Sequence, residues 1–151
     1  MLGMLKRKKR ERSSDIDDLK AKLEDTDMRL ALLKAELSAQ MIKLAGQTSD
    51  LAPLSEAEEA LSAARDYYNF ENTPVEICLV QVALGDMLLK LGREKSEKPA
   101  LVRAKTAYRL AITLASMHGD DALRKSLREK VRLVETLLGH KPKTPSLFRA
   151  A

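Results

Sequence analysis

The residues of this chain that could do catalytic or metal chemistry are few and scattered. There are two histidines, His118 and His140, and a single cysteine, Cys78. Metal binding and nucleophilic catalysis need several such groups at defined spacing, and nothing near either histidine in sequence has it. Phosphate-binding, dinucleotide-binding and nucleophile-elbow motifs are also missing. We therefore expect no enzyme: no catalytic residue, metal, cofactor or small-molecule substrate.

Each potentially reactive group also has a structural interpretation. Cys78 lies in the apolar stretch 75–80, where a cysteine is usually a small core residue. His118 belongs to a Met-His-Gly-Asp turn, and a histidine at a helix C-terminus interacts favourably with the helix dipole. Glu58 and Glu59 fall on the polar side of an expected helix, where carboxylates are normally solvated.

Basic charge is concentrated in the first twelve residues. This segment has one acidic residue and accounts for the whole net charge of +5, so the rest of the chain is neutral. Its basic residues are Lys6, Arg7, Lys8, Lys9, Arg10 and Arg12. The segment predicts a solvated flexible terminus, a contact with nucleic-acid phosphates, or a contact with an anionic membrane surface in which residues 1–5 insert.

Composition indicates an all-α protein of 151 residues, with one domain and an appendage. Aromatic residues make up only 3%, and Leu, Ala, Lys, Glu and Arg predominate over the residues that sheets prefer. A lone cysteine excludes an internal disulfide and fits a reducing compartment. The N-terminus lacks the apolar stretch of a signal peptide, and no run reaches the ~18 apolar residues of a membrane span. We expect a cytoplasmic protein.

The strongest pattern in the chain is a seven-residue apolar repeat. Ile16, Leu23, Leu30, Leu37 and Leu44 recur every seven residues, and Leu19 and Leu33 lie three residues after the first and third of them. Such a repeat keeps one apolar seam on a long helix, as coiled-coil pairing requires. Thr26 and Gln40 interrupt it. The repeat predicts a homodimer, and the flanking charges leave parallel and antiparallel pairing open.

A second apolar stripe begins at Met28 and continues through Leu32, Ala35, Ala39 and Ile42. A helix that is apolar on two sides has more than one neighbour. We therefore expect the later half of this helix to pack on the rest of the chain as well.

Turn and cap signals divide the chain. The segments are a basic flexible tail (1–13), a coiled-coil helix (14–46), a linker (47–54), a helical domain (55–139) and a flexible tail (140–151). The spacing of Ser55 and Glu58 predicts a capping box. Thr73-Pro74 predicts a further helix start, and so does the turn 119–121, with Asp120 or Asp121 as the cap. The domain then holds about four antiparallel helices, since helices joined by short turns stack as hairpins.

Within this domain, residues 76–116 resemble a tetratricopeptide (TPR) repeat. The residues that carry the resemblance are Leu84, Gly85, Leu88 and Gly92 in one helix and Ala104, Tyr108 and Ala111 in the next. Gln81 stands where the family usually has Trp. The resemblance implies a TPR-like stack of helical hairpins that binds a protein partner, with Tyr108 filling the gap between hairpins.

The resemblance also implies a concave partner groove on the first helix of the repeat. Its residues would be Leu79, Val82, Asp86, Leu89 and Lys90. Val82 and Asp86 occupy the places where chaperone-binding members have Lys and Asn, so a carboxylate clamp is not implied. A mostly apolar groove would suit an amphipathic helix. The alternative is that Leu79, Val82 and Leu89 belong to the core.

These features together predict a non-enzymatic adaptor. It would self-associate through the N-terminal helix and present helical surfaces to a protein partner. The alternatives are a small nucleic-acid-associated regulatory protein and a membrane-surface tether, both of which would use residues 1–12.

Overall fold

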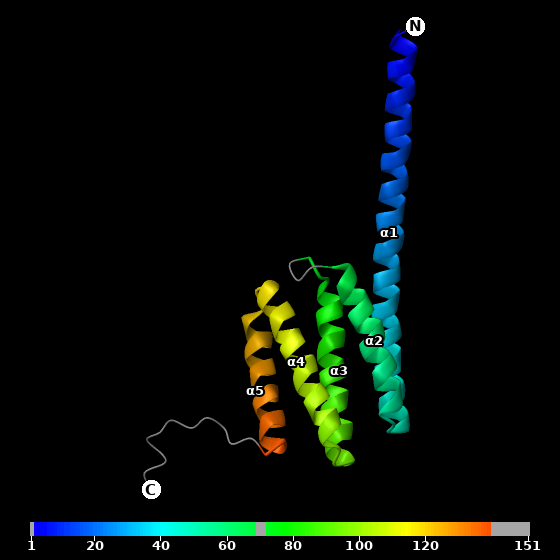
Figure 1. Ribbon diagram of the computed structural model, residues 1–151. Coiled ribbons are helices and arrows are strands. Elements are labelled where there is room, and N and C mark those ends of the chain that lie inside the picture. The colour runs from blue at the N-terminus through cyan, green and yellow to red at the C-terminus, as the bar shows by residue number, and fades with distance from the viewer. Residues whose placement is uncertain (1, 69–71, 140–151) are drawn as a thin grey trace.

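The computed structural model describes residues 2–68 and 72–139, with side chains from residue 13 onward in the first helix. The helices are α1 (Leu2–Thr48), α2 (Ala52–Tyr67), α3 (Val75–Glu94), α4 (Lys98–Met117) and α5 (Asp121–Leu137). The described residues contain no strand, so the all-α prediction is confirmed. Consecutive helices run in opposite directions, with α1 packed on α2, α3 on α4, and α5 on α4 (Figure 1). The predicted C-terminal tail, 140–151, lies outside the described residues.

Helix α1 is longer than predicted. We expected a flexible segment up to residue 13 and a helix over 14–46, but the chain is helical from Leu2. Ser13 and Ser14 are followed by an acidic turn, a pattern typical of a helix N-terminus, but they lie inside the helix. Residues 2–12 consist mainly of Leu, Met, Lys, Arg and Glu, which are strong helix formers, and a serine caps a helix only where the preceding chain leaves it. At 1.5 Å per residue, α1 is about 70 Å long.

The C-terminal half of α1 packs on the body formed by α2 and α3. One stripe of this half is buried, and its residues are Ala31, Ala35, Ser38, Ile42 and Ala45. Four of these five are small, so the backbones of α1 and α2 can approach closely. The Ser38 hydroxyl donates to the Ala57 carbonyl of α2 at 2.8 Å. This contact satisfies a polar group that is fully buried.

The second apolar stripe that the sequence predicted is only partly buried in the structure. Ala35 and Ile42 are covered as expected, but Met28 and Leu32 remain 44% and 40% exposed. The body instead covers the neighbouring positions Ala31 and Ser38. Small residues on that line allow the closer helix approach, whereas Met28 and Leu32 would hold α2 away.

Tyr108 is the centre of the packing between α3, α4 and α5. It is fully buried, and its ring lies against Gly85, where a Cβ atom would come within 2.7 Å of the ring atom Cε1. The Tyr108 hydroxyl donates to Asp86 Oδ1 at 2.6 Å. Lys130 of α5 donates to the same oxygen at 2.7 Å, and its ammonium lies 5.6 Å from the ring centroid. One aromatic side chain therefore connects three helices.

Two of the predicted helix starts differ in the structure. The Ser55–Glu58 capping box is wrong, because α2 begins at Ala52 and the Asp50 carboxylate accepts from the Ala52 amide at 3.0 Å. Pro53 in the first turn favours this earlier start. The N-cap position of α3 is occupied by Pro74 and not by Thr73. The Thr73 carbonyl accepts a hydrogen bond from His118 Nε2 at 2.5 Å, which ties the end of α4 to the start of α3.

Of the two predicted caps of α5, Asp120 is the one that the structure uses. Its carboxylate accepts a hydrogen bond from the Leu123 amide at 3.1 Å. Replacing Asp120 with Ala is expected to lower the free energy of unfolding by about 1 kcal/mol, because an otherwise unpaired N-terminal amide loses its partner. Urea denaturation followed by circular dichroism measures the change. Asp121→Ala is the matched control, since Asp121 is inside the helix, is exposed, and pairs with Arg124. An equal loss in the control would contradict the assignment.

Candidate functional site

The predicted apolar repeat forms an uncovered surface on α1. We call its seven apolar members the α1 seam: Ile16, Leu19, Leu23, Leu30, Leu33, Leu37 and Leu44. Each of them is between 43% and 63% exposed. By contrast, the large apolar side chains at the centre of the body, such as Leu54, Leu61 and Leu88, are fully buried. The described part of the chain therefore leaves the seam without a cover.

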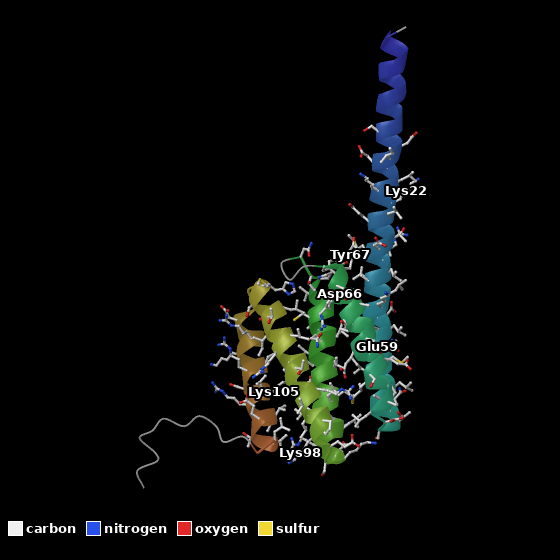
Figure 2. The ribbon with its side chains drawn as sticks, viewed as in Figure 1. Lys22, Glu59, Asp66, Tyr67, Lys98 and Lys105 are labelled. Carbon is white, nitrogen blue, oxygen red and sulfur yellow. The ribbon has the colours of Figure 1, made fainter. Side chains whose placement is uncertain are left out.

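The first part of the seam lies beyond the body altogether. The N-terminal half of α1 projects away from the other helices, as the position of Lys22 shows (Figure 2). The Tyr67 hydroxyl at the end of α2 donates to the Glu24 carbonyl at 3.0 Å, near the point where α1 meets the body. Ile16, Leu19 and Leu23 precede that contact. Their exposure therefore cannot be relieved by packing on α2.

The later part of the seam runs beside the buried stripe without overlapping it. Leu30, Leu37 and Leu44 are each followed directly by a buried residue, namely Ala31, Ser38 and Ala45. Successive residues of an α-helix point about 100° apart. The same stretch of α1 can thus pack on its own body and on another helix at the same time.

The energy available from the seam is large enough to support association. Complete burial of a leucine side chain contributes about 1.5–3 kcal/mol, and the seam residues retain roughly half of that. Covering seven of them on each of two helices is sufficient to offset the cost of association, about 4–15 kcal/mol. The seam is therefore a candidate interface.

Two polar residues interrupt the seam in different ways. The Thr26 hydroxyl donates to the Lys22 carbonyl of its own helix at 2.8 Å, so it needs no partner from outside. Gln40 is exposed, between the seam residues Leu37 and Leu44. A glutamine amide has two donors and one acceptor, so this residue must find a partner when the seam is covered.

The residues predicted to line a partner groove do not share one environment. Leu79 is 54% exposed, whereas Val82 and Leu89 pack against the core. The Asp86 carboxylate already accepts from Tyr108 and Lys130. Lys90 is exposed. Of the five, Leu79 offers the largest apolar surface to a partner.

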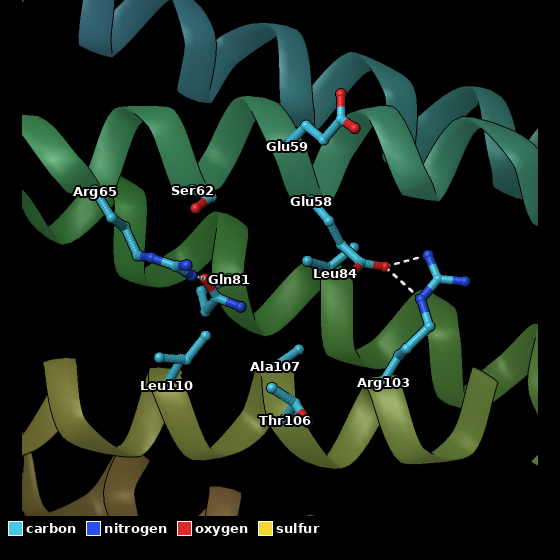
Figure 3. Close-up of a pocket in the computed structure, with 10 residues that line it drawn as sticks. All are labelled: Glu58, Glu59, Ser62, Arg65, Gln81, Leu84, Arg103, Thr106, Ala107 and Leu110. Carbon is cyan, nitrogen blue, oxygen red and sulfur yellow. Dashed lines mark hydrogen bonds and ion pairs between the residues drawn. The ribbon is translucent and has the colours of Figure 1, made fainter. Parts of the chain in front are cut away.

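A polar cleft between α2, α3 and α4 was not predicted from the sequence (Figure 3). It has a volume of about 350 Å³. Arg65 of α2 donates to the buried Gln81 amide oxygen on its floor. Burial lowers the pKa of Arg65, and the charge of Asp66 opposes that shift. Gln81 occupies a core position of α3, and its departure from the TPR pattern was the sequence signal for this polar interior.

Glu58 closes one end of this cleft. The expectation that it is simply solvated is wrong, because Arg103 of α4 donates to Glu58 Oε1 from Nε at 2.6 Å (Figure 3). Glu59 beside it is exposed, as expected. The Glu58–Arg103 pair links α2 to α4 across the cleft.

The surroundings of the single cysteine and of the buried Tyr108 also indicate structural roles. Cys78 is buried, with Sγ 3.8 Å from the Ala111 carbonyl, and burial raises the pKa of its thiol. A thiol with a raised pKa is a poor nucleophile at neutral pH. Burial and the bond to Asp86 raise the pKa of Tyr108 in the same way, which keeps its hydroxyl protonated as a donor.

The basic residues Lys6 to Arg12 lie on the first turns of α1, which are continuous with the seam. Their side chains are outside the described part of the structure. Among described residues, no three His, Cys, Asp or Glu side chains are grouped so that they could hold a metal ion. None of the described helices combines the length and apolar character that crossing a bilayer requires.

Comparison with known proteins leaves the family of this chain open. No family model, no curated protein and no solved structure matches it. The residues that carry the TPR resemblance are all buried in the α3–α4 hairpin: Leu84, Gly85, Leu88, Gly92, Ala104, Tyr108 and Ala111. Membership of the TPR superfamily stays a prediction that rests on those residues.

Proposed function

We propose that this chain is a non-enzymatic adaptor that forms a homodimer through the α1 seam and binds a protein partner through its helical surfaces. The observation that carries the proposal is the exposure of all seven seam residues, which follow one another along a single side of α1. A second copy supplies a surface with the same seven-residue spacing, which is the requirement for knobs-into-holes packing.

The charges beside the seam are compatible with self-association. Residues 13–48 contain both acidic and basic side chains, so two copies do not carry a large excess of one sign. Lys22 and Asp27 are favourably placed across a parallel pair, and Arg29 is already paired with Asp25 of its own helix at 3.0 Å. Exposed pairs contribute at most about 1 kcal/mol each, so the apolar seam determines the stability of the dimer.

The mass of the full chain in solution tests the dimer. Sedimentation equilibrium at micromolar concentration is expected to give twice the 16.8 kDa of one chain. A mass of one chain at tens of micromolar would overturn self-association. A pull-down from native extract, with and without nuclease, tests the adaptor role: a protein retained in stoichiometric amount after nuclease supports it, and loss of all bound material refutes it.

A second candidate function is nucleic-acid association through residues 1–12. The observation that favours it is the continuity of α1, which joins the basic segment to the seam without a break. In a dimer the basic charge of two chains would act on one polyanion, and multivalent contact raises apparent affinity.

Deletion of residues 1–12 separates the two functions. The shortened chain is expected to remain a dimer, because the seam begins at Ile16. If the basic segment holds nucleic acid, binding to a DNA duplex should be lost on deletion. In the full chain that binding should fall by about 10³-fold or more between 50 and 200 mM salt, since phosphate contacts release counterions. Fluorescence anisotropy measures both changes. Unchanged duplex affinity after the deletion would exclude this segment as the binding site.

A further inference from the structure

The polar interruptions of the seam carry information about how two copies pair. The seam has two rows of positions along α1. One row is entirely apolar and consists of Ile16, Leu23, Leu30, Leu37 and Leu44. The other row is mixed and consists of Leu19, Thr26, Leu33 and Gln40. Parallel and antiparallel pairing combine these rows differently.

We infer that two copies of α1 pair in parallel and in register, with Gln40 of one copy facing Gln40 of the other. This inference depends on the proposed homodimer. In a parallel pair each seam position meets the same position of the second copy. In an antiparallel pair the residues of one row meet those of the other row.

Antiparallel pairing would leave the Gln40 amide without a partner. Every member of the apolar row is Leu or Ile, so Gln40 would face an aliphatic side chain whatever the offset between the helices. A buried amide without a hydrogen bond is costly. In the parallel arrangement the two Gln40 amides can donate to and accept from each other. Thr26 does not discriminate, because its hydroxyl already bonds within its own helix.

The flanking charges do not oppose the parallel register. Parallel helices bring a residue on one side of the seam near the residue five positions later in the second copy. Asp15 with Lys20 and Lys22 with Asp27 then attract, while Arg29 with Lys34 repels. The Asp25 carboxylate, 3.0 Å from Arg29, weakens that repulsion. The charges therefore permit the register that Gln40 favours.

The parallel register has a consequence for the whole molecule. The buried stripe of α1 lies on a different side from the seam, so both bodies flank the paired helices at one end. The first turns of both α1 helices, which contain the basic residues, then share the opposite end (Figure 1). An antiparallel pair would instead separate the two basic segments by most of the length of α1.

Disulfide cross-linking of Gln40→Cys tests the register in the full chain. A disulfide requires the two Cα atoms to lie about 4.4–6.8 Å apart, which only a parallel, in-register pair provides at this position. Under a glutathione redox buffer, most of the Q40C protein is expected to run as a disulfide-linked dimer on a non-reducing gel. Leu33→Cys, in the same row, should also form a disulfide-linked dimer. It tests the register independently if the Q40C substitution disturbs the packing around position 40.

Three controls make the outcome decisive. The wild-type chain should not cross-link, because its only cysteine, Cys78, is buried. Leu32→Cys is also exposed but lies off the seam, so it should cross-link poorly. Leu23→Cys mixed with Gln40→Cys should not form a mixed disulfide in a parallel pair, where the two positions are about 25 Å apart along the helix.

The measurements distinguish a wrong register from the absence of a dimer. A dimeric mass with no self-linked Q40C or L33C would overturn the parallel register alone, and a mixed L23C–Q40C disulfide would in addition establish antiparallel pairing. A monomeric mass by sedimentation would overturn the proposed homodimer itself.

Discussion

Leu30→Asp is expected to convert the dimer into a folded monomer. Leu30 lies at the middle of the α1 seam and is 49% exposed in the single chain, so an aspartate there is tolerated before association. In the pair, two carboxylates would lie in one apolar layer, where they lose both leucine burial and hydration. A loss of about 4–6 kcal/mol raises the dissociation constant by roughly 10³–10⁴-fold. Sedimentation equilibrium measures the dissociation constant.

Leu32→Asp is the matched control for this prediction. Leu32 is two residues further along the same helix, is 40% exposed, and lies on a different side of α1 from the seam. The same charge placed there should leave the dimer intact. Circular dichroism should show full helix content in both variants. A dimeric mass for L30D would refute the seam as the interface, and dissociation of both variants would show that the effect is not specific to the seam.

The long-range pattern of this chain could be predicted because it depends on helix periodicity alone. The seven-residue repeat predicted an apolar seam, and the structure leaves every seam residue exposed beside a body that packs elsewhere. The all-α class was predictable from composition, and the cap of α5 was predictable from a single turn, in which the structure uses Asp120 and not Asp121. The use of the seam by a second copy stays a prediction.

The features that were not predicted have two causes: helix propensity summed over a segment, and contacts between residues distant in sequence. The start of α1 at Leu2 reflects cumulative helix propensity over 2–12, which outweighed the local serine signal. Glu58 was expected to be solvated because Arg103, 45 residues away, is invisible to a local pattern. The polar contact of buried Gln81 was not predicted, because its partner Arg65 comes from another helix. Local sequence patterns predict the apolar faces and caps of helices, whereas the partners of polar side chains depend on tertiary packing.

Tyr108→Ala should destabilise the body more than any change on its surface. The Tyr108 ring is fully buried against Gly85, and its hydroxyl and face contact Asp86 and Lys130, so the truncation opens a cavity shared by α3, α4 and α5. Aromatic-to-alanine changes in cores cost about 3–5 kcal/mol. That is a large part of the 5–15 kcal/mol typical of a domain, and we expect a fall in melting temperature of roughly 10–20 °C.

Tyr108→Phe separates the ring from the hydroxyl. Phenylalanine fills the same space, and Asp86 keeps its contact with Lys130 at 2.7 Å, so the loss should be only about 1 kcal/mol. Thermal and urea unfolding of both variants should be followed by circular dichroism at one protein concentration, because dimerisation makes apparent stability depend on concentration. If the two variants lost the same stability, the hydrogen bond to Asp86 would be the important contact and the ring would not be the centre of the packing. A loss below about 1 kcal/mol in Y108A would mean that the three helices are held together independently of Tyr108.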